Sequence, residues 1–238
     1  MRAVLTLLSL LVIFLRLVAA EPLVLDREPV PSSKAAKSHP LQEIELADPT
    51  LAATDAKRQQ LKYLVNCALP DSMVLSSVQG HERFTFPGHI GLAPGWLKAP
   101  MTPSQERWVS ACMLALTNYF GKHVEVSLHA DPMLVHFLEQ TKEETRTFTI
   151  FEGGFFGNLF SANPVAYVCS GTQTKIEAQD PVFHDRICTK ATGETTLDGK
   201  SLTSCHFILT GPCSDPASFT VNGETYHEVI FVSLKPTK

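Results

Sequence analysis

The sequence predicts an α+β fold: two helices of the N-terminal half packed on a mostly antiparallel sheet, stapled by disulfides. Apolar residues recur at helical spacing in two segments of the first half, whereas strand-like segments joined by turn residues fill the second half. Helices followed by strands are typical of α+β domains. The sequence lacks the regular strand–helix alternation of a doubly wound parallel sheet.

The first predicted helix begins at Asp48, an N-cap aspartate that is followed by proline, and ends near Ala68, before Pro70. Its apolar residues repeat at helical spacing: Leu61, Leu64, Val65 and Ala68.

The second predicted helix has the strongest local signal. Thr102 and Gln105 form a capping box around Pro103, and Gly121 provides a C-terminal stop. One apolar stripe follows the helix: Trp108, Val109, Cys112, Leu116 and Tyr119.

Between these helices the sequence predicts a hairpin and an irregular loop. Residues 73–78 and 83–86 are short strands around Gly80. The glycines and prolines of residues 88–96 are incompatible with regular structure.

The second half is predicted to be rich in strands. Residues 124–128 alternate between apolar and polar side chains, residues 133–140 predict a short helix, and the polar residues 170–203 predict long loops. Asn222-Gly223 is a strong hairpin turn signal. The remaining strand segments are residues 146–152, 165–169, 205–210, 218–221 and 224–233.

Residues 1–20 have the pattern of a cleavable secretory signal. Arg2 precedes an apolar run at residues 4–15, and residues 18–20 supply small side chains for cleavage. The predicted location is therefore secreted or periplasmic. Arg16 favours the alternative, an uncleaved anchor, although the run is shorter than the about 20 residues of a membrane span.

Residues 21–47 are rich in proline and predict a flexible linker, and residues 48–238 predict a single globular domain. Cleavage leaves 18 basic and 24 acidic residues, a net charge of −6. An acidic surface disfavours nucleic acid and anionic membranes as partners. After the signal no apolar run is long enough for a membrane span. The sequence identifies no particular partner, so the partner is unknown.

Six cysteines in an exported chain predict a disulfide framework. They are Cys67, Cys112, Cys169, Cys188, Cys205 and Cys213. The sequence leaves their connectivity open. The preferred pairing joins Cys205 with Cys213 around a Gly-Pro turn, Cys169 with Cys188 around a polar stretch, and Cys67 with Cys112 on the two helices.

A catalytic cysteine is the main alternative to this framework. Cys112 with Asn118 and either His123 or His129 would suit a thiol hydrolase. The expected position of Cys112 on the apolar stripe inside a helix disfavours a reactive thiolate. No Cys-x-x-Cys pair is present, so a zinc knuckle and a redox pair are not predicted.

Residues 152–160 form the most unusual stretch, with three glycines among three phenylalanines. As a ligand site, Phe155, Phe156 and Asn158 would contact the ligand, and a desolvated Glu152 would act as a general acid or base. Trp96 on its loop is a second candidate for ligand contact. The alternative for each of these places is a tight turn or loop whose aromatic side chains fill the core.

The sequence predicts no metal site and no cofactor, and it assigns a catalytic role to no residue. His123 and His129 would share a strand face about 20 Å apart, which is too far for one metal ion. His136, seven positions after His129, does not complete a group of metal ligands with them. His184-Asp185 is interpreted as a solvated surface pair. A carboxylate pair for glycoside hydrolysis stays open, the residues to test being Glu125, Glu152 and Asp185.

Four segments resemble a group of uncharacterised secreted proteins from myxobacteria and similar Gram-negative bacteria. They are residues 61–70, 91–94, 108–112 and 157–160. The resemblance, which covers about residues 60–215, implies a bacterial extracytoplasmic location and no known activity. Such proteins are often lipoproteins, and this chain departs from them because no acceptor cysteine follows its signal.

Two functional hypotheses follow. The first is an exported, disulfide-stabilised protein with a binding or structural role at the cell envelope or outside the cell. The second is a secreted hydrolase acting on cell-wall, glycan or peptide substrates, with Glu152 as its acidic residue.

Overall fold

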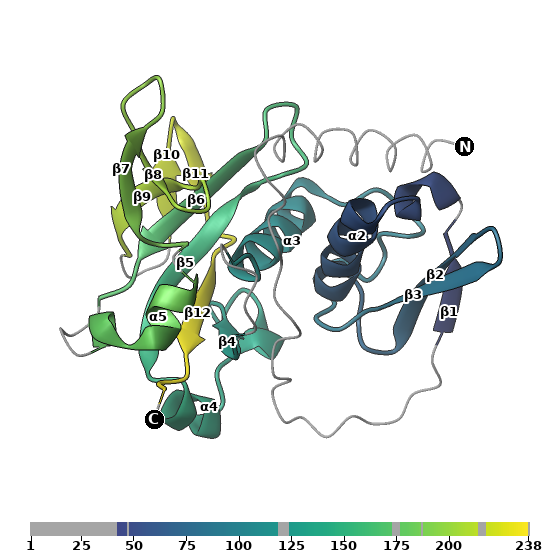
Figure 1. Ribbon diagram of the computed structural model, residues 1–238, viewed down its shortest axis with the longest axis horizontal. Helices are drawn as coiled ribbons and strands as arrows, with labels where there is room; N and C mark the ends of the chain where they lie inside the picture. The colour runs from purple at the N-terminus through teal and green to yellow at the C-terminus, as the bar shows by residue number, and fades with distance from the viewer. Residues whose placement is uncertain are drawn as a thin grey trace. The chain divides into compact units, whose positions relative to one another are not determined.

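The computed structural model describes residues 42–46, 48–118, 124–172, 177–186, 188–213 and 218–237 (Figure 1). It confirms the α+β class, with a mostly antiparallel main sheet. The predicted signal and most of the predicted linker lie outside the described residues. The described chain forms two compact units. The first unit holds residues 42–113 and 159–164, and the second holds residues 114–158 and 165–237.

The first unit opens with two successive helix starts instead of the one predicted. The Asp48 side chain accepts a hydrogen bond from Thr50 N (2.9 Å), as expected of an N-cap, but it caps only the 3₁₀ helix η1 (Pro49–Ala52). A second cap, Thr54, accepts from Lys57 N (3.3 Å) and begins α2 (Asp55–Ala68). The predicted single helix is wrong because each cap residue has extended backbone angles, which interrupt a helix.

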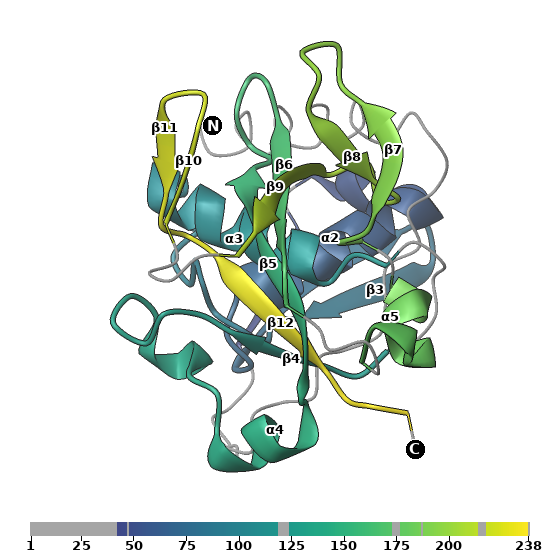
Figure 2. The ribbon, with the colours of Figure 1, turned by 90° about the vertical axis from the view of Figure 1, so that its left-hand side faces the viewer.

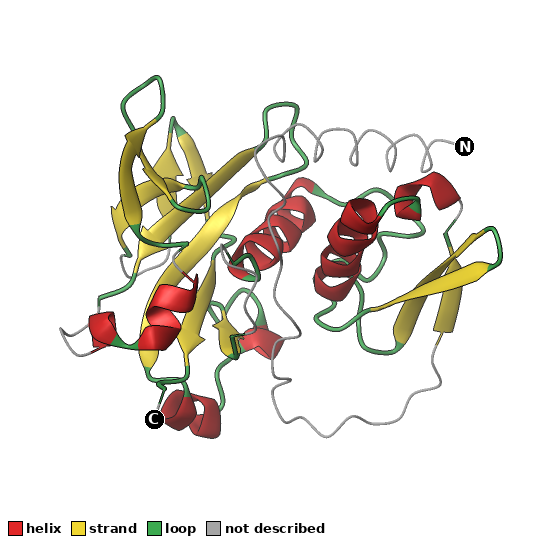
Figure 3. Ribbon diagram, in the orientation of Figure 1, coloured by secondary structure: helices red, strands yellow, loops and turns green. Residues whose placement is uncertain are grey.

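A three-stranded sheet completes the regular structure before the second helix (Figure 3). The hairpin of β2 (Met73–Gln79) and β3 (Glu82–Pro87) is confirmed, and Gly80 at its turn has a φ of 62°. Strand β1 (Gln42–Glu45) pairs in parallel with β2, so part of the predicted linker is a strand.

The irregular loop at residues 88–96 is confirmed, and its backbone completes the end of α2. Backbone N–H groups of Ile90, Leu92 and Ala93 donate to carbonyl oxygens of the last helical turn at 2.8–3.0 Å. The last carbonyls of a helix have no partner inside it, and this loop supplies one. Gly91, with a φ of 83°, allows the chain to make the required turn.

The capping box of α3 (Pro103–Ala115) is confirmed. Thr102 N donates to Gln105 Oε1 (2.9 Å), and Gln105 N donates to Thr102 Oγ1 (3.3 Å). The helix ends at Ala115, before the predicted stop at Gly121, which lies outside the described residues.

The second unit is built on a seven-stranded sheet in the order β4-β12-β5-β6-β9-β8-β7 (Figures 1 and 2). Its strands are β4 (Val126–His129), β5 (Ile150–Asn158), β6 (Val165–Ser170), β7 (Ala191–Thr195), β8 (Ser201–Thr203), β9 (Ile208–Pro212) and β12 (Ile230–Leu234). All neighbouring pairs are antiparallel except β6 and β9. The separate hairpin of β10 (Phe219–Val221) and β11 (Glu224–Tyr226) turns at Asn222-Gly223 as predicted, with positive φ at both residues. Its predicted second strand, residues 224–233, is wrong in extent, because it ends at Tyr226 and β12 joins the main sheet.

Several predicted elements of this unit are wrong in extent or type. Residues 133–140 contain only the 3₁₀ turn η2 (His136–Leu138). The predicted strand at residues 146–152 begins late, because α4 (Lys142–Thr147) precedes it with a capping box of Thr141 and Glu144. The predicted long loops at residues 170–203 contain β7, β8, η3 (Glu177–Gln179) and α5 (Pro181–Arg186).

The glycine-rich stretch after Glu152 is a central strand instead of a turn. The strand contains glycines because atoms of the neighbouring strands lie too close to leave room for a side chain. A Cβ atom at Gly157 would clash with Val165 O, and the φ of Gly157 is 142°. A Cβ atom at Gly154 would lie 2.8 Å from the Phe231 ring. The glycines are therefore explained by packing within the sheet.

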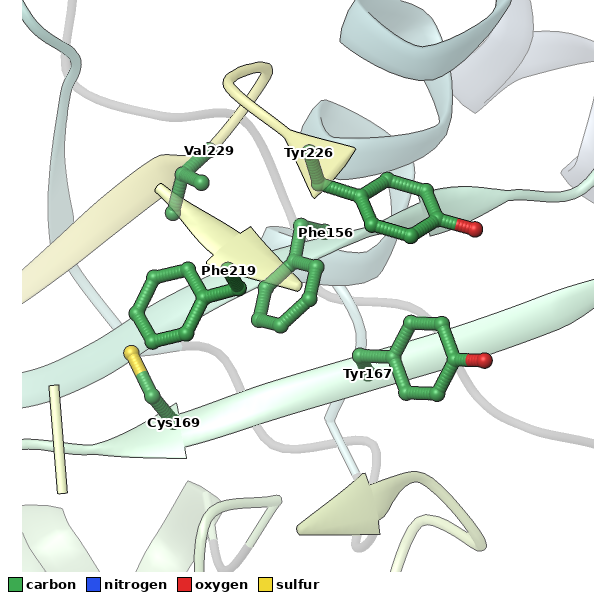
Figure 4. Close-up of a cluster of buried hydrophobic side chains, with 6 residues drawn as sticks. All are labelled: Phe156, Tyr167, Cys169, Phe219, Tyr226 and Val229. Atoms are coloured by element: carbon green, nitrogen blue, oxygen red, sulfur yellow. The ribbon is translucent and has the colours of Figure 1, made fainter. Parts of the chain in front are cut away.

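One face of this sheet carries an aromatic cluster (Figure 4). Its buried members are Phe156, Tyr167, Cys169, Phe219, Tyr226 and Val229. Phe156 stacks on Phe219 with ring centroids 4.6 Å apart, and on its register partner Tyr167 at 5.4 Å. The β10–β11 hairpin thus packs its aromatic side chains against β5 and β6.

Candidate functional site

The predicted ligand-contact residues lie mostly in the core. Trp96 is 4% exposed in the first unit, and Glu152 is 1% exposed in the second. Phe155 and Phe156 are fully buried on neighbouring positions of β5, and Asn158 is partly buried at the end of that strand. A ligand cannot reach side chains that other side chains enclose, so this geometry favours the core interpretation of the stretch.

Glu152 is one half of a buried ion pair for which the sequence contains no local signal. Arg186 Nε donates to Glu152 Oε2 at 3.0 Å, and both side chains are buried. Arg186 Nη2 also donates to Ala115 O, at the end of α3, at 2.7 Å. One guanidinium therefore connects β5, α5 and the C-terminal end of α3. A general acid must reach its substrate, and Glu152 is enclosed by this pair.

The other carboxylates do not join Glu152 in a described site. Glu125 forms a surface ion pair with Lys235, with Oε2 and Nζ 2.9 Å apart. The Asp185 side chain lies outside the described part of the structure, as does the His184 side chain. Across the residues that the structure describes, no three histidine, cysteine, aspartate or glutamate side chains are placed to hold a metal ion.

All six cysteines are described, and each is in a disulfide. The Cys67–Cys112 pairing is confirmed, with Cα atoms 5.9 Å apart. The catalytic role considered for Cys112 is wrong, because a thiol nucleophile requires a free thiolate.

The other two preferred pairings are wrong. The structure pairs Cys169 with Cys213 and Cys188 with Cys205. Cys205 and Cys213 lie beyond opposite ends of β9, whose five extended residues alone span about 16 Å. Cys213 instead reaches Cys169 because β6 and β9 are parallel neighbours, with Ser170 opposite Pro212.

His129 packs between aromatic rings and is not placed as a metal ligand. Its ring centroid lies 5.6 Å from that of Phe231 and 6.4 Å from that of Phe151. Burial lowers the pKa of His129 to about 4, an effect that the nearby Glu144 carboxylate only partly opposes. His136 is exposed, and His123 lies outside the described residues.

This burial predicts a loss of stability in mild acid. Between pH 6.5 and 4 the unfolded chain binds a proton at His129 while the folded chain does not, so the free energy of unfolding falls as the pH falls. The expected loss is about 3 kcal/mol by pH 4. Urea unfolding across this range should show a shallower pH dependence for His129→Phe than for the wild type. Exposed His136→Gln is the control and should keep the wild-type slope. An unchanged slope in His129→Phe would contradict the prediction.

One surface feature was missed in the sequence. Residues 131–138, here called the apolar loop, connect β4 to α4 and are the teal segment left of β4 in Figure 2. Met133 is 80% exposed, Leu134 51% and Phe137 48%, while Val135 is buried. The sequence predicts a short helix over residues 133–140, which holds most of these apolar residues. Because the segment makes only a 3₁₀ turn, most of them face solvent.

The comparisons with known proteins do not identify the chain. No protein-family model matches the sequence, and no curated protein or solved structure matches it. None of the described helices is long and apolar enough to cross a membrane.

Proposed function

We propose that this protein is exported and has a binding or structural role at the cell envelope or outside the cell. The observation that carries the proposal is the pairing of all six cysteines in three disulfides. Disulfides form and persist in oxidising compartments and are rare in the cytosol. The secretory pattern of residues 1–20 provides the route of export.

A binding or structural role is favoured over the hydrolase alternative. A hydrolase needs an accessible acid or nucleophile. Glu152, its strongest candidate, is enclosed in an ion pair with Arg186, and Cys112 is bonded to Cys67. The resemblance to secreted proteins of myxobacteria supports a bacterial, extracytoplasmic origin as part of the same proposal.

The test is to express the full chain in a Gram-negative host and to fractionate the cells. The expected product begins at Glu21, lies outside the cytoplasm, and has no cysteine that reacts with iodoacetamide under denaturing, non-reducing conditions. A control chain that lacks residues 1–20 should stay in the cytoplasm with reactive thiols. A full chain found in the cytoplasm with its first 20 residues and free thiols would refute export.

A further inference from the structure

The apolar loop exposes three large apolar side chains that contribute little to the folded core. Met133, Leu134 and Phe137 fall within one short segment. Elsewhere in the described chain, the exposed large hydrophobic residues are Val78 and Leu197, which are isolated in the sequence. Single exposed apolar residues are ordinary on protein surfaces, whereas a group of them marks an interaction surface.

The backbone of the apolar loop is held in one shape by hydrogen bonds. Asp131 Oδ1 accepts from Met133 N (2.9 Å), and Asp131 O accepts from Leu134 N and Val135 N (2.9 and 3.0 Å). Ala130 N donates to Leu138 O (3.1 Å), which ties the two ends together. A loop that is already ordered loses less conformational entropy when it binds.

The exposed area indicates what kind of surface fits this loop. Three partly exposed side chains present only a few hundred Å² of apolar area. A stable interface buries about 800 Å² on each partner, so the loop alone cannot hold a second copy face to face. A pocket on a protein partner that surrounds the loop would, unlike a flat interface, bury these three side chains completely. Insertion of three side chains into lipid would give only weak membrane binding.

The charge of the loop and of the helix that follows it also favours a protein pocket over a membrane. Acidic residues outnumber basic ones between residues 131 and 146, with a net charge of −2. They are Asp131, Glu139, Glu143 and Glu144 against Lys142 and Arg146. This surplus is complementary to a cationic rim and repels an anionic membrane.

We propose that the apolar loop is a docking element that inserts into an apolar pocket, rimmed by cationic side chains, on a protein partner. The proposal rests on the binding role proposed above and assigns that role to one surface. Phe137 and Leu134 are its central contacts, since large apolar side chains in a desolvated pocket contribute most of the binding energy.

The experiment places a photo-crosslinking benzoylphenylalanine at Leu134 in the full chain, in the producing organism. The same group at Leu197, fully exposed on the β7–β8 turn, is the matched control. We expect one discrete protein adduct from position 134 and none from position 197. The partner, identified by mass spectrometry and purified, should bind Phe137→Asp about tenfold or more weakly. Leu197→Asp should bind as the wild type does, and added salt should weaken binding.

Other outcomes would overturn the proposal. An adduct of twice the chain mass would assign the loop to a second copy. Cosedimentation with phosphatidylcholine vesicles, with or without phosphatidylglycerol, that Phe137→Asp abolishes would assign it to lipid. An adduct only from position 197 would leave the binding role in place and refute the loop assignment. No adduct from either position would refute both, provided that the circular dichroism spectra match the wild type.

Discussion

Arg186→Met should destabilise the second unit by about 3–5 kcal/mol, because it leaves the Glu152 carboxylate buried without its cation. The same change removes the donor to Ala115 O. Urea unfolding followed by far-UV circular dichroism measures the loss. The double variant Glu152→Leu/Arg186→Met removes both charges and should recover part of the stability, since an apolar pair needs no compensation.

The exposed pair of Lys235 and Glu125 is the matched control for this prediction. Its atoms are 2.9 Å apart, close to the distance in the buried pair, but both side chains reach solvent. Lys235→Met should therefore change the free energy of unfolding by about 1 kcal/mol or less. If Arg186→Met costs no more than Lys235→Met, the buried pair does not stabilise the fold in the way described. If Arg186→Met kept the wild-type stability, Glu152 would again be a candidate general acid.

Phe156→Ala should cost about 3–5 kcal/mol, because it removes the central ring of the aromatic cluster and leaves a cavity. The lost contacts include stacking on Phe219 and Tyr167, at centroid distances of 4.6 and 5.4 Å. Urea unfolding monitored by near-UV circular dichroism follows the cluster through two of the four tyrosines, Tyr167 and Tyr226. The two tryptophans lie in the first unit and report separately on it.

Leu197→Ala is the control for the cavity, because Leu197 is fully exposed. This substitution should lower the free energy of unfolding by less than about 0.5 kcal/mol. A loss below about 1 kcal/mol for Phe156→Ala would show that the ring is not a core element. That result would favour the ligand-contact interpretation of the stretch, which predicts lost binding with little lost stability.

These two predictions bear on function as well as on folding. The residue types that suggested chemistry in the sequence, a carboxylate among aromatic residues and a cysteine near histidines, occupy the core and the disulfides. The sequence predicts a short helix over residues 133–140, yet Met133, Leu134 and Phe137 in this segment are exposed and can contact a partner. A search for function in this protein therefore begins at the apolar loop.

Part of the candidate site could be predicted from the sequence. The sequence predicts either a core role or ligand contact for Phe155 and Phe156, and large aromatic residues are mostly core material. The apolar loop was not predicted, because apolar spacing by itself does not distinguish a buried helix face from an exposed 3₁₀ turn. Arg186 carried no signal, since its partner Glu152 is 34 positions away and the contact exists only after the sheet forms.

The sequence by itself determined what depends on neighbouring residues. The capping box at Thr102, the hairpin turns at Gly80 and Asn222-Gly223, and the α+β class follow from local hydrogen bonds and backbone preferences. Only the tertiary structure decided what depends on distant strands. The parallel pairing of β6 and β9 selects Cys213 as the partner of Cys169, and close strand packing explains the glycines of β5. Burial likewise turned Glu152 from a candidate acid into half of an ion pair, because solvent access depends on the whole fold and not on the residues beside it.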